Sequence, residues 1–376
     1  MRITLIAPVY PLRGGIAQYT AILYLELKKK GHEVQIINFK RQYPKIFFPG
    51  KTQTETSEAP IKIDSKIIID SINPLTWFQA YREIKKFGTE LVIFKYWMPF
   101  FAPCLGTISR LSRRLAKSKT MMIGDNILPH EKRIGDITMT HFILNSTDLF
   151  ITQSETVKKD LLSLKPNAHY RNTPHPIYNI FGDPVQKHDA KVQLKISADR
   201  VLLFFGFIRR YKGLDILLHA MPVVLKQLNV HLLIAGEFYE SEEEYRDLIK
   251  KLNLEDRVTL YADYCPNEKV GQFFCASDAV VLPYRSATQS GIVQIAYHFN
   301  KPAIVTDVGG LAEVVLDNVT GFIAPPNNPE KIAESILRFY AEKREAEFAK
   351  NIEIEKKKYT WETFVEVLEE LAGVAR

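Results

Sequence analysis

The sequence predicts an α/β protein that consists of two doubly wound domains in series. Residues 2–39 follow the order strand, loop, helix, strand, which is the order of a βαβ unit. The same alternation of short apolar strands and amphipathic helices begins again near residue 201. Between the two series, residues 178–197 are polar and contain Gly182 and Pro184, so a domain boundary is expected there. Two such series in one chain are typical of two doubly wound α/β domains.

The first domain is expected to begin with a strand over residues 2–7 and a loop over residues 8–15. The amphipathic pattern of residues 16–30 predicts a helix that ends at Gly31. Apolar runs then predict further strands at 33–39, 67–69, 91–94, 120–123 and 149–152. Helices are predicted between these strands at 77–87 and 105–117.

The second domain repeats this alternation. Strands are predicted at 201–205, 231–235, 258–261, 279–282 and 303–306. Helices are predicted at 214–228, 242–252, 267–276 and 292–299, followed by a charged helix at 341–358 and an amphipathic one at 361–374. The predicted divisions of the chain are an N-terminal domain at 1–182, a C-terminal domain at 183–360 and a last helix at 361–376.

The composition is that of an ordinary globular protein. Of the 376 residues, 46% are hydrophobic and 25% charged, which excludes a wholly disordered chain. The N-terminal apolar stretch is too short for a signal peptide, and no apolar run reaches the ~20 residues of a membrane span. Three cysteines without a CxxC pattern favour a reduced, cytoplasmic protein. The net charge of +7 suits an anionic substrate, an anionic membrane surface or a plain basic protein, and no nucleic-acid-binding module is recognisable.

The absence of several motifs argues against certain classes of enzyme and binding site. No G-x-G occurs, which argues against a dinucleotide-binding dehydrogenase. No D-x-D pair occurs, so a metal bound to a diphosphate is not expected. Gly50-Lys51-Thr52 resembles the end of a P-loop, but Lys45 stands where the first glycine of that loop is required.

One glycine loop, residues 11–15, follows the first predicted strand and opens the first helix. Gly14 and Gly15 would let backbone N–H groups approach a ligand, and the helix N-terminus favours negative charge. The loop therefore suits a phosphate or a polar acceptor. A tight turn without any ligand explains the two glycines equally well.

A basic loop follows the first strand of the second domain. After Gly206 come Arg209, Arg210 and Lys212. Arginine can grip a phosphate through two hydrogen bonds, and lysine adds a point charge. Because open α/β sheets bind ligands at the carboxyl ends of their strands, we expect a phosphate site here rather than a solvated loop.

Two further loops follow strands of the second domain. Before the helix at 292–299, small polar residues at a helix start form an anion-binding arrangement, with ordinary N-capping as the compatible alternative. The candidates in this loop are Thr288, Gln289, Ser290, Gly291 and Ile292. In the loop 307–313, Gly310 allows close approach of a ligand. Glu313 would either accept hydrogen bonds from ribose hydroxyls or cap the next helix.

The order and spacing of four segments resemble the group 1 (family 4) glycosyltransferases, which have the GT-B fold. The segments are GGIAQYT, GFIRRYKGLDILLHAM, VVLPYRSATQSGIVQIAYHFNKPAIVTDVGGLAEVV and TGFIAPPNNP. The resemblance covers essentially the whole chain and is strongest over residues 201–335. It implies two Rossmann-like domains that face a deep cleft, with the helix at 361–376 crossing back to the N-terminal domain.

The resemblance also implies a reaction. A sugar would pass from a nucleoside-diphosphate sugar of UDP or GDP type to a saccharide or lipid-linked acceptor, with retention at the anomeric carbon and without a cofactor or metal. The nucleotide would bind to the C-terminal domain and the acceptor to the N-terminal domain. Lys212 and either Arg209 or Arg210 would hold the leaving diphosphate, and Gly14 and Gly15 would contact the donor.

The sequence departs from the family pattern at a pair of glutamates. Those positions correspond here either to Thr288 and Ala296 or to Ala287 and Ile295, depending on how the segment is aligned with the family pattern. Neither alignment provides a carboxylate. A non-catalytic GT-B binding protein therefore remains an alternative, and a GT-B nucleotide-sugar epimerase is another.

Two more departures concern single residues. Phe207 stands where the family has a basic residue after the strand-end glycine. Asp125 lies nearest to the place of a histidine that often follows a strand of the family's N-terminal domain. His130, in the same loop, is retained as a catalytic candidate that would contact an acceptor or a sugar hydroxyl.

Residues 97–119 contain aromatic side chains and five basic residues, and they contain no acidic residue. Such a segment can bind an anionic membrane, which would place the protein at the inner membrane face. The alternative, which we favour, is that the aromatic residues pack inside the domain while the cations solvate a helix face.

Overall fold

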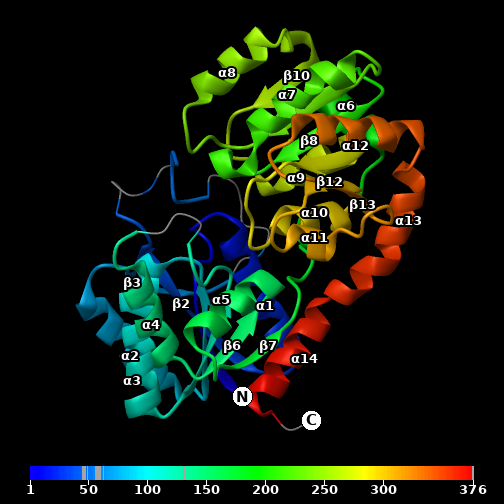
Figure 1. Cartoon of the computed structure of the whole chain (residues 1–376). Coiled ribbons are helices and arrows are strands. Elements are labelled where there is room, and N and C mark those ends of the chain that lie inside the picture. Colours follow the sequence, from blue (N-terminus) through cyan, green and yellow to red (C-terminus); the bar gives the residue numbers. More distant parts are fainter. Residues whose placement is uncertain (45–47, 49, 56–60, 62, 130–132, 375–376) are drawn as a thin grey trace. The chain divides into compact units, whose positions relative to one another are not determined.

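The computed structural model describes residues 1–44, 48, 50–55, 61, 63–129 and 133–374. The chain divides into two compact units (Figure 1). Unit 1 comprises the residues up to 55, residues 61–176 and the residues from 359 onward, and unit 2 comprises residues 177–358. Each unit is described by itself.

Unit 1 contains, in its described residues, a seven-stranded parallel sheet in the order β3-β2-β1-β4-β5-β6-β7. The strands are β1 (Arg2–Ile6), β2 (Glu33–Arg41), β3 (Lys66–Asp70), β4 (Leu91–Tyr96), β5 (Lys119–Gly124), β6 (Leu149–Thr152) and β7 (His169–Asn172). Strand β4 is buried along its whole length, which explains why its sequence is an apolar run interrupted by Lys95.

The helices of unit 1 are α1 (Gly15–Lys29), α2 (Pro74–Phe87), α3 (Ala102–Leu111), α4 (Asp136–Ser146), α5 (Glu155–Leu164) and α14 (Trp361–Ala372). Helix α2 shows why these boundaries arise. The Asn73 side chain accepts a hydrogen bond from the Leu75 N–H at 3.1 Å, and Pro74 occupies the first helical position. At the other end, Gly88 adopts the left-handed conformation that ends a helix.

Helix α14 packs against α1 within unit 1 (Figure 1). The rings of Trp361 and Tyr19 meet edge to face, with centroids 4.8 Å apart. His32 and Glu369 are joined by a hydrogen bond of 2.8 Å, and Lys30 donates to Glu366 at 3.1 Å. The last helix of the chain is therefore an integral part of the N-terminal unit.

Unit 2 contains, in its described residues, a six-stranded parallel sheet in the order β10-β9-β8-β11-β12-β13. The strands are β8 (Val201–Phe205), β9 (His231–Ala235), β10 (Val258–Tyr261), β11 (Ala279–Leu282), β12 (Ala303–Thr306) and β13 (Gly321–Ala324). The helices are α6 (Lys187–Gln193), α7 (Leu214–Leu225), α8 (Glu242–Lys251), α9 (Asn267–Ala276), α10 (Gly291–His298), α11 (Leu311–Val314), α12 (Pro329–Ala341) and α13 (Glu345–Glu355). Strands β8, β9, β11 and β12 share one hydrophobic cluster with helices α7 and α12.

The predicted doubly wound fold is confirmed, but some elements differ. The predicted helix at 105–117 is an α-helix up to Leu111, which continues as a π-helical turn over Ser112–Ala116. The predicted charged helix at 341–358 is α13, which begins only at Glu345. Strands β7 and β13 were not predicted: the β7 sequence HYRN lacks an apolar run, and the apolar β13 sequence GFIA was not recognised as a strand.

The passage from unit 1 to unit 2 lies between Pro176 and Ile177, ahead of the predicted boundary at 182/183. The reason is packing. The Tyr178 ring lies so close to Gly291 that a Cβ atom on this glycine would be 2.9 Å from it, and the Phe181 carbonyl approaches Gly271 in the same way. The chain returns to unit 1 at Tyr359, slightly before the predicted start of the last helix.

None of the helices in the described part of the chain has both the length and the apolar character that crossing a bilayer requires.

Candidate functional site

The strand order of unit 2 reverses between β8 and β11. Such a switch point, at the carboxyl ends of the strands, is where open α/β sheets bind ligands. The loop that follows β8 contains the basic residues 206–213, and the loop that follows β11 contains residues 283–291. The fold thus brings two of the predicted loops to the same place.

Close backbone packing holds these two loops together. Gly213 has a φ of +68°, and a Cβ atom there would lie 2.1 Å from the Pro283 carbonyl oxygen, so only glycine fits. The Arg285 N–H donates to the Tyr211 carbonyl oxygen at 2.7 Å. The conformation of the basic loop is therefore set by the loop after β11.

An ion pair reinforces the same junction. The Arg285 guanidinium donates to both carboxylate oxygens of Asp215, at 2.8 and 2.6 Å, and also to the Arg210 carbonyl oxygen at 2.8 Å. Burial alone would raise the pKa of Asp215, but the hydrogen bonds and the charge of Arg285 hold it below its usual value. Arg285 is thus a structural cation whose charge is already balanced.

Lys212 is the buried cation of the site. Its side chain is 8% exposed, and within the described residues its ammonium makes no hydrogen bond. Burial, and then the positive charge of Arg209, lower its pKa from 10.5 to about 7. The absence of a side chain on Gly206 leaves room for it, because a Cβ atom there would lie 3.1 Å from the Lys212 Nζ. An anion bound here would complete the coordination of this amine.

Arg209 and Arg210 differ in their surroundings, although the sequence offered either as the second cation. Arg209 is exposed, with its guanidinium carbon 4.7 Å from the centroid of the Tyr239 ring, and its charge acts on Lys212. The Arg210 backbone N–H donates to the Glu240 carboxylate at 2.8 Å. The geometry therefore favours Arg209 as the partner of Lys212.

The third and fourth predicted loops also meet. Gly309, with a φ of +48°, lies so close to residue 287 that a Cβ atom would be 1.7 Å from the Ala287 carbonyl oxygen. The Gly310 N–H donates to the Thr288 carbonyl oxygen at 3.2 Å. Thr288 is buried, whereas Glu313 is exposed in the first turn of α11.

The start of α10 lies beside the basic loop. The Ile292 side chain is 3.2 Å from the position of a Cβ atom on Gly206. Gln289, Ser290 and Gly291 are half-buried. Ser290 occupies the N-cap position, but its side chain makes no capping hydrogen bond, so the capping role considered for it is not observed.

In unit 1, the strand order reverses between β1 and β4. Gly14, with a φ of +104°, precedes α1, and Gly15 is exposed as its first residue. The Arg13 N–H donates to the Gln53 carbonyl oxygen at 3.2 Å, which anchors the loop. The predicted glycine loop therefore lies at the switch point of its own sheet.

A buried polar cluster beside this switch point was not predicted. Lys95, 3% exposed at the end of β4, donates to Asp125 at 2.5 Å and to the Gln153 side-chain oxygen at 3.4 Å. Its Nζ lies 3.7 Å from the centroid of the Tyr19 ring. Burial, followed by the charge of Lys95, lowers the pKa of His175 to about 3, so this histidine is neutral. A lysine within an apolar strand was the signal that sequence reasoning overlooked.

Ser154 caps α5 by accepting the Val157 N–H at 3.3 Å, so its hydroxyl has a structural role. His130 lies outside the described residues, so its catalytic role stays a prediction.

The aromatic residues of segment 97–119 pack inside unit 1. The Trp97 indole donates to the Tyr43 hydroxyl at 2.7 Å, and Phe101 is fully buried. The Arg113 guanidinium forms an ion pair with Asp148 at 2.7 Å. The inward packing that we favoured is therefore observed, and membrane contact stays a prediction.

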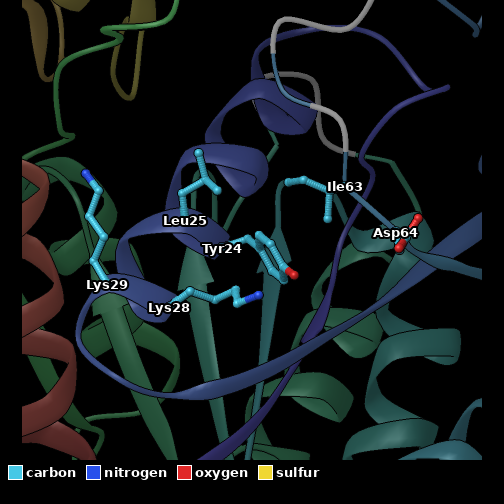
Figure 2. A pocket seen from close by; sticks show the side chains of 6 residues that line it. All are labelled: Tyr24, Leu25, Lys28, Lys29, Ile63 and Asp64. Carbon is cyan, nitrogen blue, oxygen red and sulfur yellow. The ribbon is translucent and has the colours of Figure 1, made fainter.

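A pocket on unit 1 is lined by none of the predicted site residues. Figure 2 shows its lining side chains from α1 and from the segment before β3. They are Tyr24, Leu25, Lys28, Lys29, Ile63 and Asp64. None was predicted to bind a ligand, and the pocket is not assigned to the donor or the acceptor.

Comparisons with known proteins agree with this arrangement. Residues 199–342, which include the switch point of unit 2, match the family described as glycosyl transferases, group 1. The chain is 26% identical over 366 residues to an uncharacterized glycosyltransferase of Methanocaldococcus jannaschii, covering 90% of this chain and 88% of the relative. It is 23% identical over 365 residues to a D-inositol 3-phosphate glycosyltransferase of Thermobifida fusca, covering 88% and 81%.

Solved structures share the fold. A sucrose-phosphate synthase from Thermosynechococcus elongatus matches with a TM-score of 0.76 and 20% identity over 100% of both chains. HepE from Anabaena, solved in complex with UDP-glucose, matches with a TM-score of 0.77 and 16% identity over 100% of both chains. Together with the two parallel sheets, these similarities show a GT-B fold, and residues 199–342 match the family of group 1 glycosyltransferases.

Proposed function

We propose that this glycosyltransferase moves a sugar from a nucleoside-diphosphate sugar to a saccharide or lipid-linked acceptor, with retention at the anomeric carbon. The observation that carries the proposal is Lys212, a buried amine that makes no hydrogen bond within the described residues and lies beside the Arg209 charge. In the described part of the chain no carboxylate forms an ion pair with Arg209 or Lys212, and two such cations suit an anion with more than one negative charge.

In this proposal the two cations stabilise the diphosphate as it leaves. Lys212, with a pKa of about 7, takes up a proton when the diphosphate arrives, because a nearby anion favours the charged form of an amine. The cations do the neutralising that a metal ion does in other transferases. The residues at the family's glutamate positions are Thr288 and Ala296, or Ala287 and Ile295, so the reaction proceeds without a protein nucleophile there.

Similar proteins support a uridine nucleotide as the donor base. HepE from Anabaena has been solved with UDP and with UDP-glucose. A starch synthase from Arabidopsis thaliana, with 15% identity, has been solved with ADP and acarbose, so an adenine nucleotide is the second choice. A cytoplasmic location is part of the proposal, and contact of residues 97–119 with the inner membrane face is the alternative to the inward packing described above.

The second candidate function is a non-catalytic binding protein of the same fold. It is favoured by the missing glutamate pair alone. The two candidates agree on nucleotide binding and differ only in turnover, so a single set of samples can separate them.

The test begins with thermal unfolding in the presence of UDP, GDP, ADP, TDP and CMP. A nucleotide at 100 times its dissociation constant adds about 2.7 kcal/mol if it binds only the folded state. We expect stabilisation by one diphosphate, and we expect Arg209→Ala with Lys212→Ala to abolish it. The exposed Lys226→Met serves as a matched control that should keep the effect.

Turnover is measured next, as release of the nucleoside diphosphate from the matching sugar nucleotide with and without acceptors. Release that requires an acceptor supports the transferase. Binding without release supports the non-catalytic protein, and interconversion of the donor without an acceptor supports an epimerase. If no nucleotide stabilises the chain, the assignment of the donor site is wrong.

A further inference from the structure

Three aromatic side chains follow three neighbouring strands of unit 2 and form a stack. Phe207 follows β8, Tyr239 follows β9 and Tyr264 follows β10. The ring centroid of Phe207 lies 4.6 Å from that of Tyr239 and 6.0 Å from that of Tyr264. The Arg209 guanidinium carbon lies 4.7 Å from the Tyr239 ring centroid, within the range of a cation–π interaction. The aromatic stack is thus connected to one cation of the candidate phosphate site.

The backbone fixes this arrangement. Beyond the ends of β8 and β9, the ladder continues through a parallel bridge between Ile208 and Phe238. Hydrogen bonds of 2.9 and 3.0 Å join Ile208 to the backbone on either side of Phe238. Ile208 is buried in the hydrophobic cluster of unit 2. Because side chains alternate along an extended segment, Phe207 and Arg209 point away from that cluster, toward the face on which Tyr239 lies.

Arg209 needs such support because of Lys212. Two neighbouring cations repel each other, and an exposed arginine has enough rotatable bonds to turn into water. Among the described residues, no carboxylate contributes to the pKa of Lys212, so this repulsion is not offset. The Lys212 Nζ lies 5.6 Å from the centroid of the Tyr284 ring, and the Asp215 carboxylate is paired with Arg285. Without a ligand, the favourable contact shown for the Arg209 guanidinium is the Tyr239 ring.

We propose that Tyr239 is a positioning residue, whose ring, braced by Phe207, holds the Arg209 guanidinium beside Lys212 so that both cations meet the same diphosphate. The proposal rests on the proposed function for the identity of the ligand. It also explains how the site works with Phe207 at the position that is basic in the family. The aromatic residue at 207 supports the ring that holds the arginine at 209, so the cation is supplied from two residues further along the loop.

The first test is a double-mutant cycle with inorganic pyrophosphate and UDP as probes, read by calorimetry. Tyr239→Leu removes the ring and is expected to weaken binding about 2- to 30-fold, the range of one cation–π contact. Tyr239→Phe keeps the ring and is expected to restore most of the affinity. In the Arg209→Ala background, Tyr239→Leu is expected to cause no further loss.

The matched control is Tyr24→Leu. The Lys28 Nζ lies 5.5 Å from the Tyr24 ring centroid, so this variant removes a cation–π contact of the same kind on unit 1, at the pocket of Figure 2. It is expected to leave pyrophosphate binding unchanged. An equal loss from Tyr239→Leu with and without Arg209 would mean a general structural role and would overturn the proposal.

The second test needs no ligand. The charge of Arg209 contributes to the lowered pKa of Lys212, so removal of the Tyr239 ring should let that charge move away. The pH at which Lys212 becomes reactive toward an amine-labelling reagent, followed by mass spectrometry, is therefore expected to rise in Tyr239→Leu and in Arg209→Ala. It is expected to stay unchanged in Tyr24→Leu.

The two tests distinguish failure of the proposed donor site from failure of the proposed positioning role of Tyr239. If the unmodified chain binds neither pyrophosphate nor any nucleotide, the proposed donor site fails, while the labelling profile still decides whether Tyr239 holds Arg209. If the chain binds its nucleotide but neither affinity nor labelling changes in Tyr239→Leu, the donor site stands and the positioning role of Tyr239 is wrong.

Discussion

Replacing Lys212 by methionine should stabilise unit 2, by an amount that depends on pH. The pKa of Lys212 is about 7 in the folded chain, against 10.5 for an exposed lysine. The unfolded chain therefore holds this proton more tightly, and the free energy of unfolding rises with pH between these two values. From the pKa difference, keeping Lys212 in the fold costs about 4 kcal/mol at pH 7 and about 2 kcal/mol at pH 9. The advantage of the methionine variant should fall by about 2 kcal/mol over this interval.

The assay has to report on unit 2 alone. The three tryptophans, Trp77, Trp97 and Trp361, all lie in unit 1, so their fluorescence follows the other unit. Hydrogen exchange of the β8 and β11 amides in increasing urea gives the unfolding free energy of unit 2 at each pH. The exposed Lys226→Met is the control, with no change expected between pH 7 and pH 9. If Lys212→Met raises the unfolding free energy of unit 2 by the same amount at both pH values, the assignment of Lys212 as a buried amine with a lowered pKa is wrong.

Two further predictions concern stability. Asp125→Asn should lower the unfolding free energy of unit 1 by about 3–5 kcal/mol, because Lys95 would keep a buried charge without its carboxylate. Adding Lys95→Met should recover most of that loss, and tryptophan fluorescence during urea unfolding checks both variants; no recovery would contradict the ion-pair explanation. Gly213→Ala should lower the urea midpoint more than Gly31→Ala. Both glycines have a positive φ, but a Cβ atom at Gly213 would meet the Pro283 carbonyl at 2.1 Å, whereas Gly31 has nothing within 4 Å. If the two variants have equal urea midpoints, the structure relieves the clash at residue 213 and this prediction is wrong.

Most of the fold could be predicted because its signals are local. The first strand, the glycine loop and the helix that follows it are consecutive in the sequence, and each has its own periodicity or breaker. The same holds for Gly206 and the basic loop after β8. Strand β7 has a weaker pattern, because its sequence HYRN is polar and partly exposed. Its existence depends on pairing with β6 rather than on composition.

The candidate site was predictable only in part, because its contacts join distant residues. The sequence could not choose between Arg209 and Arg210, since the choice depends on a ring that follows a different strand. The pairing of Lys95 with Asp125 likewise depends on the adjacency of β4 and β5. A sequence shows which residues follow a strand, but the strand order decides which of those residues meet.

The division of unit 1 in the sequence has a consequence for synthesis. The described residues of unit 2 form one continuous stretch, 177–358, whereas unit 1 is completed only by α14, which is translated after that stretch. At about 5–20 residues per second, the ribosome needs roughly 10–40 seconds to make the segment between them. During that time the face of α1 that receives Trp361 is uncovered. Unit 2 can therefore be complete before unit 1, although most of unit 1 is translated first, because unit 1 still lacks α14.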